Sequence, residues 1–168
     1  MDSVLIICAM ALLVPYVIFP QVMHGLSPTP QALPELNDPT AWPTVDILFA
    51  AYNEAAVLDQ KLQSMLDVDY PIGKLRIWVG SDCSDDGSED ILEAYAQKHG
   101  NLQWVAMRKR SGKSAIINHL VDLSQGNIII GTDANIFFDP QAVKAMVRPM
   151  MDDSAIDMVG GRLVYHGM

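Results

Sequence analysis

Two stretches of the chain decide its fold: LRIWVGSDCSDDGS at residues 75–88 and IIIGTDAN at residues 128–135. In each of them a short apolar strand runs directly into a polar loop that carries carboxylates. Parallel sheets bind ligands in the crevice outside the carboxyl ends of their strands. Acidic loops at two such ends predict a bound cation or a polar ligand with hydrogen-bond donors. Together with Lys113 they indicate a nucleotide diphosphate held through a metal.

Outward from these stretches, the hydrophobic period alternates between that of strands and that of helices. We expect strands at residues 45–51, 75–80, 102–107, 127–131 and 156–165. We expect helices at residues 54–67, 88–99, 114–123 and 140–151. Strictly alternating elements form right-handed βαβ units. The predicted fold class is therefore α/β, with a mainly parallel, doubly wound sheet and flanking helices.

Local patterns add detail to these elements. The isoleucines of strand 127–131 predict a strand that is buried on both faces. Ser88 is the expected N-cap of its helix, and Pro140 is expected in the first turn of the last helix. The buried side of helix 54–67 is expected to comprise Val57, Leu58, Leu62, Met65 and Leu66.

The composition bounds the class of protein. The chain has 168 residues, of which 50% are hydrophobic, so it can bury the core of one domain. Its net charge of -9 argues against a nucleic-acid partner, because neutralising phosphates needs a basic face. Cys8 lies in an apolar stretch and Cys83 in a polar loop. We therefore expect no disulfide framework, which fits a reducing compartment.

The N-terminal residues indicate where the protein is located. No charge occurs from Val4 to Phe19, and about 20 apolar residues span a bilayer as a helix. We therefore expect residues 1–23 to form a membrane anchor, with a signal peptide or a buried core helix as the alternatives. The prolines in residues 24–43 predict an extended linker. The globular domain follows at residues 44–168, and the acidic N-terminus favours a position of this domain in the cytoplasm.

Two of the loops after strands suit turns or phosphates. Residues 50–54, Ala-Ala-Tyr-Asn-Glu, turn tightly into a helix, and Glu54 suits the positive helix end. A helix cap alone is the alternative. Residues 108–114 form a basic loop that opens onto a helix, which makes a good phosphate site. The loop is not a Walker motif, because Met107 stands where that motif needs glycine. A solvated charged face is the alternative for this loop.

The acidic loop after the second strand has the spacing of an EF-hand calcium loop at Asp82, Ser84, Asp86, Gly87 and Glu93. An EF-hand needs a helix before the loop, and a strand is expected there, so we reject an EF-hand. Asp82 is instead expected to accept a hydrogen bond from a base N–H, while Asp86 and Gly87 shape the turn. A solvated acidic turn that caps the next helix is the alternative.

Asp133 follows the end of the isoleucine-rich strand. A carboxylate at a buried strand end costs free energy unless it is paired or bound to a metal. Oxygen ligands together with substrate phosphates are the usual way in which proteins hold Mg²⁺ or Mn²⁺. We therefore expect a divalent cation at Asp133, with an aspartate that only caps the turn before Pro140 as the alternative.

The four loops, in this order, resemble the donor half of a family 2 glycosyltransferase with the GT-A fold, a Rossmann-like sheet. The resemblance covers about residues 44 to 165. The matching motifs are Ala51-Tyr52-Asn53-Glu54, the acidic loop 82–88, Gly112-Lys113-Ser114-Ala115 with Asn118, and Thr132-Asp133-Ala134-Asn135. The resemblance implies a nucleotide-sugar site that comprises Ala51, Tyr52, Glu54, Asp82, Asp86, Lys113 and Asp133.

In this resemblance Tyr52, Glu54 and Asp82 hold the uridine-like part of a nucleotide-diphospho-sugar. Lys113 lies near the diphosphate. Asp133 and Asn135 stand where the family has its Asp-x-Asp motif for Mg²⁺ or Mn²⁺. The asparagine carries no charge, so we expect a lower affinity for the metal.

The resemblance further implies that the sugar is transferred to an acceptor, a glycan or a lipid, with inversion. The general base and the acceptor motif lie in the family's second half, and the residues up to Met168 offer no candidate for either. We therefore expect a donor-binding portion that binds nucleotide and transfers little sugar alone. A nucleotidyltransferase, or a calcium or nucleotide sensor without catalysis, are the alternatives.

Overall fold

The computed structural model describes residues 13–26 and 41–164. The chain divides into two compact units, Met1–Asp38 and Pro39–Met168.

The described part of the first unit is helical. A short π-helix, η1 (Val14–Ile18), continues into the α-helix α2 (Phe19–Leu26). Among the residues described, no helix has the length and apolar character needed to cross a membrane. Residues 1–12 of the expected anchor and residues 27–40 of the expected linker lie outside the described residues.

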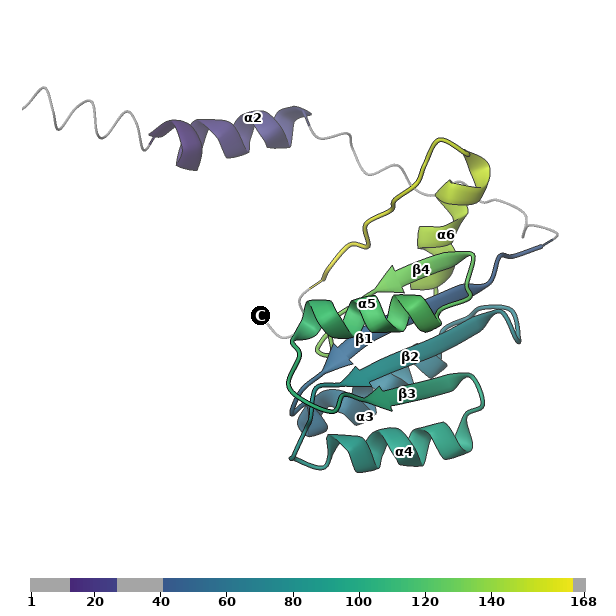
Figure 1. Ribbon diagram of the computed structural model, residues 1–168. Helices are drawn as coiled ribbons and strands as arrows, with labels where there is room; N and C mark the ends of the chain where they lie inside the picture. The colour runs from purple at the N-terminus through teal and green to yellow at the C-terminus, as the bar shows by residue number, and fades with distance from the viewer. Residues whose placement is uncertain (1–12, 27–40, 165–168) are drawn as a thin grey trace, which may run out of the picture. The chain divides into compact units, whose positions relative to one another are not determined.

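The second unit is built on a four-stranded parallel sheet with the strand order β3-β2-β1-β4 (Figure 1). The strands are β1 (Val45–Ala51), β2 (Leu75–Ser81), β3 (Leu102–Ala106) and β4 (Ile128–Gly131). Ala51 pairs with Ser81, and Ser81 with Ala106, so three strands end at the same level. The predicted parallel α/β sheet is confirmed, and the loops after its strands leave from one edge.

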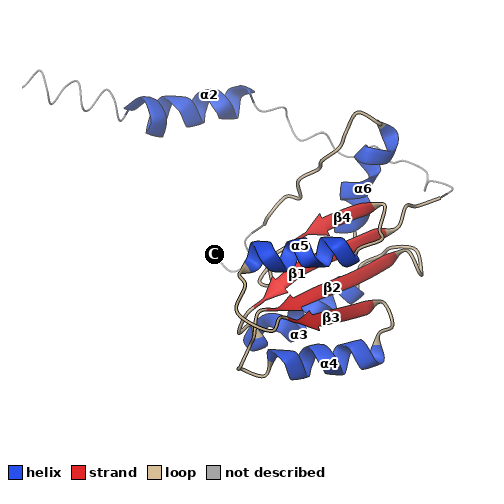
Figure 2. Ribbon diagram, viewed as in Figure 1, coloured by secondary structure: helices blue, strands red, loops and turns tan. Residues whose placement is uncertain are grey.

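Helices cover both faces of this sheet (Figure 2). They are α3 (Ala55–Leu66), α4 (Ser88–Lys98), α5 (Lys113–Leu123) and α6 (Ala142–Asp152). On one face, apolar side chains of α3, α4 and α6 pack in one core with Phe49 and Ile77. On the other face, Ile116 and Leu120 of α5 pack around Leu48. The helix that opens with Lys113 therefore lies on the opposite face from α3.

One glycine lets the first turns of α5 lie close to β2. Gly80 ends the apolar part of β2, and a Cβ at this position would lie 2.1 Å from Cγ2 of Ile116. Only a glycine allows so close an approach of the helix to the strand. This contact brings Lys113, at the start of α5, near the edge where β1 and β2 end.

β4 contradicts the prediction of a strand buried on both faces. Ile129 is 44% exposed, while Ile128 and Ile130 are half-buried. β4 stands last in the strand order and pairs with β1. The prediction was wrong because a run of isoleucines does not distinguish a central strand from an edge strand.

Three expected boundaries also differ. Residues 156–164 form no strand, and Tyr165 of the expected strand lies outside the described residues; Gly160 and Gly161 weaken strand formation at this point. Gly87, with φ of 91°, is the N-cap of α4, and Ser88 is the first helical residue. Pro140 precedes α6, whose N-cap is Gln141.

Candidate functional site

The loop after β2 turns its first carboxylate into the protein. Asp82 is only 3% exposed, and its carboxylate accepts hydrogen bonds from the backbone N–H groups of Ser111 (2.7 Å) and Gly112 (3.0 Å). Nε of Arg110 donates to the same carboxylate at 3.2 Å. The Ser111 amide is the main cause that lowers the pKa of Asp82, with further contributions from Gly112 and Arg110. Asp82 is therefore a fixed anion at neutral pH.

The loops after β1 and β3 meet at this carboxylate. The guanidinium of Arg110 stacks on the ring of Tyr52, with its central carbon 3.3 Å from the ring centroid. The carbonyl of Ala51 accepts a hydrogen bond from the backbone N–H of Asp82 at 2.9 Å. Tyr52 keeps 43% of its surface exposed. The structure thus brings the predicted residues Ala51, Tyr52 and Asp82 together, with a partly exposed tyrosine, stacked on by Arg110, beside a buried carboxylate.

Sequence reasoning did not single out Arg110 within the basic loop. Four cations in six positions give no sign of which one turns toward the neighbouring loops. The feature of the sequence that could have indicated Arg110 is the length of the loop between β3 and Gly112, which allows this arginine to reach the loop after β2.

Asp86 holds the starts of two helices. Its Oδ2 accepts from the backbone N–H of Ala55 at 2.9 Å, at the start of α3. Its Oδ1 accepts from the backbone N–H and the hydroxyl of Ser88, at the start of α4, at 3.0 and 2.6 Å. The Ser88 hydroxyl in turn accepts from the backbone N–H of Glu54 at 3.0 Å. Asp86 and Ser88 therefore shape the turns that present Tyr52 and Asp82.

Two residues in these turns adopt left-handed backbone angles. Asn53 has φ of 53°, which asparagine tolerates well, and its side chain exchanges hydrogen bonds with Asp85 at 2.8 and 3.0 Å. Cys83 has φ of 60°, and its Sγ donates to the carbonyl of Met107 at 3.0 Å. These angles fold the acidic loop back on β1, so that its carboxylates bind protein amides.

The rejected EF-hand is confirmed as absent by the element before the loop, which is the strand β2. Within residues 13–26 and 41–164, no three histidine, cysteine or acidic side chains lie close enough to hold a metal ion.

The other end of the edge carries Asp133 and Asn135, both exposed, in the loop after β4. Nζ of Lys113 donates to Oδ1 of Asp133, and the two side chains are 62% and 51% exposed. The predicted residues Lys113 and Asp133 are thus in contact. One carboxylate and one amide oxygen suit Mg²⁺ or Mn²⁺ that retains waters and shares substrate phosphates, because such ions need few protein ligands.

A buried lysine lies behind this loop. Lys61 of α3 is 0% exposed, and its Nζ donates to Oγ1 of Thr132 at 3.1 Å and to the carbonyl of Ile136. The ammonium also lies 4.7 Å from the ring centroid of Phe138 and 5.4 Å from that of Phe49. Burial lowers the pKa of Lys61 to about 7, against the charge of Asp133, which raises it.

Lys61 was not among the residues predicted from the sequence. The predicted buried side of α3 is confirmed at Leu58, Leu62 and Met65, which are buried, whereas Val57 and Leu66 are half-buried. Lys61 shares this stripe through its spacing from Leu58 and Met65. A charged residue inside an apolar helix stripe was the signal that could have found it.

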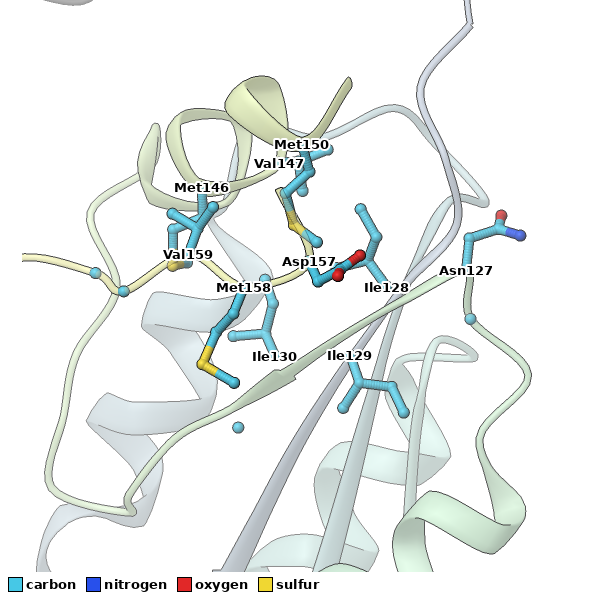
Figure 3. Close-up of a pocket in the computed structure, with 14 residues that line it drawn as sticks. Asn127, Ile128, Ile129, Ile130, Met146, Val147, Met150, Asp157, Met158 and Val159 are labelled. Carbon is cyan, nitrogen blue, oxygen red and sulfur yellow. The ribbon is translucent and has the colours of Figure 1, made fainter. Parts of the chain in front are cut away.

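A cavity of about 570 Å³ lies beside β4, and none of the predicted site residues lines it (Figure 3). In Figure 3 Met146, Val147 and Met150 of α6 lie opposite Ile128 and Ile130 of β4. Asp157 is the acidic side chain in its wall. This largely apolar lining does not suit a diphosphate, so the loops remain the candidate site.

Comparison with known sequences assigns the chain to a family. Glycosyl transferase family 2 matches residues 46–168. The chain belongs to this family. It is 31% identical over 123 residues to the probable glycosyltransferase YdaM of Bacillus subtilis, an alignment covering 71% of this chain and 29% of YdaM. It is 34% identical over 95 residues to the beta-monoglucosyldiacylglycerol synthase of Trichormus variabilis, covering 55% of this chain and 20% of the synthase. The chain thus spans less than a third of the length of these relatives.

Solved structures with a similar fold agree with this assignment. The mannosyltransferase PcManGT from Pyrobaculum calidifontis, in complex with GDP-Man and Mn²⁺, matches with a TM-score of 0.65 and 27% identity, over 80% of this chain and 41% of that enzyme. TarS of S. aureus, in complex with UDP-GlcNAc, matches with a TM-score of 0.59 and 22% identity, over 65% of this chain and 31% of TarS. The parallel sheet with flanking helices is therefore GT-A-like.

Proposed function

We propose that this chain binds a nucleotide-diphospho-sugar, with UDP-sugars as the first candidates, and that the whole enzyme transfers the sugar to a glycan or lipid acceptor with inversion. The observation that carries the proposal is the arrangement of one edge of the sheet. A buried carboxylate beside an exposed aromatic ring occupies one part of it, and a carboxylate paired with a lysine occupies another. The base of a nucleotide suits the first part, and its diphosphate suits the second.

The base end comprises Tyr52, Asp82 and Arg110. The guanidinium of Arg110 stacks on the ring of Tyr52. A base stacks on this guanidinium or takes its place on the ring. The charged carboxylate of Asp82 accepts hydrogen bonds from N–H groups, which matches the imide N–H of a uracil or the N–H groups of a guanine. Glu54, the N-cap residue of α3 and two positions after Tyr52, belongs to the same proposed contact.

The diphosphate end comprises Lys113, Asp133 and Asn135. Lys113 stands at the first position of α5, where backbone N–H groups and the helix dipole favour an anion. Asp133 and Asn135 offer the two oxygens that would hold Mg²⁺ or Mn²⁺, in competition with Lys113 for the carboxylate. When bound, such an ion would stabilise the negative charge of the departing diphosphate. Lys113, released from Asp133, then binds a phosphate oxygen.

The likeness to a mannosyltransferase that was solved with GDP-Man and Mn²⁺ supports both the nucleotide-sugar and the metal. The general base and the acceptor site belong to the proposal for the whole protein, because this chain covers a minor part of its relatives. The uncharged run Val4–Phe19 supports a membrane anchor, with the domain 44–168 in the cytoplasm.

Calorimetric titration of the 168-residue chain tests this proposal. UDP and GDP are titrated separately in 2 mM MnCl₂ (roughly the concentration that saturates weak carboxylate sites) and in EDTA. We expect one nucleotide to bind more tightly with Mn²⁺, and Asp133→Ala to remove that gain. Asp122→Ala, an exposed aspartate on α5, is the matched control and should bind like the wild type. A folded wild-type chain that binds neither nucleotide would contradict the donor site.

A further inference from the structure

We propose that Lys61 is a positioning residue for the loop that carries Asp133 and Asn135, and that it holds this loop in the form that binds the metal and diphosphate. The inference rests on the proposed donor site. It concerns a residue that lies behind the site and touches neither of the two expected metal ligands in the contacts described above.

The contacts of Lys61 bracket the loop. Its Nζ binds Oγ1 of Thr132, directly before Asp133, and the carbonyl of Ile136, directly after Asn135. The short segment between these two anchor points thus has both ends attached to one atom. Because Ala134 is 5% exposed while its two neighbours are exposed, the side chains of Asp133 and Asn135 are turned outward together.

A second contact from α3 extends this attachment. The hydroxyl of Ser64, one turn along the helix from Lys61, accepts a hydrogen bond from the backbone N–H of Phe138 at 3.1 Å. It also donates to the carbonyl of Lys61 at 2.8 Å. α3 therefore holds the segment 132–138 at Thr132, Ile136 and Phe138. This helix is packed in the main core, so the loop takes its position from a rigid element.

Lys61 acts through its hydrogen bonds to the loop and not through its charge. Burying an ammonium costs desolvation free energy, and a well-packed apolar side chain is often at least as stable in such a place. Its charge also opposes a cation bound nearby. What lysine supplies, and methionine does not, is a set of N–H donors at the end of a long side chain. Two donors are enough for Thr132 and Ile136, so the attachment of the loop is the contribution of Lys61.

Lys61→Met tests the proposal, because methionine fills nearly the same volume without donors. Lys74→Met, at an exposed lysine in the turn before β2, is the matched control. In the 168-residue chain, UDP affinity is measured by calorimetry in MnCl₂ and in EDTA. We expect Lys61→Met to weaken binding in Mn²⁺ about tenfold, the equivalent of roughly 1.4 kcal/mol. Binding in EDTA, which reports the base end, should stay within about twofold of the wild type. GDP replaces UDP if the wild-type chain prefers it.

Amide hydrogen exchange gives a second readout that needs no ligand. We expect the amides of residues 133–138 to exchange about tenfold faster in Lys61→Met, while those of β1 and β2 keep their protection. Thr132→Val removes one acceptor of Lys61 and should also speed exchange at residues 133–138. This variant keeps the test available if Lys61→Met fails to fold. In the double variant the two changes should not add, because they remove the same interaction.

The outcomes separate the two proposals. Unchanged exchange at residues 133–138 in Lys61→Met, or an equal loss of UDP affinity in Mn²⁺ and in EDTA, would overturn the positioning role. If the wild-type chain binds no nucleotide, the donor site fails. The exchange data then still decide whether Lys61 fixes the loop.

Discussion

At the base end of the candidate site, Asp82 is buried and backbone amides bind its carboxylate, whereas at the diphosphate end Asp133 is half exposed and binds the side chain of Lys113. Backbone donors cannot move without moving their loop. The Lys113 side chain can leave Asp133 by changing rotamers, at little cost on an exposed surface. The base end is therefore organised before any ligand arrives, and the diphosphate end is built to exchange partners.

The same contrast extends to what lies behind each carboxylate. The loop 108–112 supports Asp82 through Ser111, Gly112 and Arg110. The loop that carries Asp133 is attached to α3 through the buried side chain of Lys61 and through the hydroxyl of Ser64. Changes at the base end should affect nucleotide binding with and without metal, and changes at the diphosphate end should affect the metal-dependent part.

The largest effect is expected from Asp82→Ala. This change leaves the amides of Ser111 and Gly112 without their acceptor, frees Arg110 and removes the proposed partner of the base. We expect UDP affinity to fall about 100-fold in calorimetry, because hydrogen bonds to charged groups contribute roughly 1.5–3 kcal/mol. The loss should be the same in Mn²⁺ and in EDTA. A loss confined to Mn²⁺ would show that Asp82 belongs functionally to the metal end.

A smaller loss at the same end is expected from Tyr52→Ala. Removing an aromatic stacking surface costs about 1–3 kcal/mol per base, so UDP affinity should fall roughly tenfold. Tyr52→Phe keeps the ring and should stay within about twofold of the wild type. Equal losses in the two variants would mean that the phenol hydroxyl, and not the ring, makes the contact.

The pH dependence of stability should distinguish the two ends. The pKa of Lys61 is about 7 in the folded chain, and that of an unfolded lysine is higher, so the unfolded chain binds the additional proton above pH 7. The contribution of Lys61 to the free energy of unfolding should therefore rise by about 1 kcal/mol between pH 7 and 8. Asp82 adds nothing in this range, because its pKa is lowered from an already acidic value.

Urea unfolding of the wild type and of Lys61→Met, measured from pH 6 to pH 9, gives this contribution as a difference. Other titrating groups cancel in the comparison. Parallel pH profiles for the two chains would contradict the lowered pKa of Lys61.

The smallest effect is expected from Asn135→Asp, which restores a second carboxylate. The Mn²⁺ concentration needed for half-maximal UDP binding should fall by about threefold, because an added carboxylate strengthens the attraction of a divalent cation. Asn127→Asp, in the turn before β4, adds the same charge elsewhere and is the control. An unchanged Mn²⁺ requirement would remove Asn135 from the expected metal ligands.

Much of the architecture followed from local patterns. The alternating periods of strand and helix predicted β1 to β4 and α3 to α6 with boundaries close to those observed. The strand expected at residues 156–165 was wrong: residues 156–164 pair with no strand, and they contain two glycines, which weaken strand formation. Pairing is a property of two segments, and the pattern of one segment does not contain it.

The candidate site divides in the same way. Asp82 and Asp133 were predicted because carboxylates at strand ends stand out in an apolar context, Lys113 from its basic loop before a helix, and Tyr52 from the family resemblance. Their contacts were not found, because each one joins loops that lie 20 or more residues apart: Asp82 with Ser111, and Lys113 with Asp133. Lys61 stayed hidden because its partners lie 71 and 75 residues away.

By itself, the sequence determined that this chain forms a parallel α/β sheet with acidic and basic loops at one edge, because hydrophobic period and turn residues act over a few neighbouring positions. Only the tertiary structure decided which side chains meet at that edge. Burial makes the difference: packing α3 against the sheet takes Lys61 out of water and leaves Thr132 and Ile136 as its hydrogen-bond acceptors.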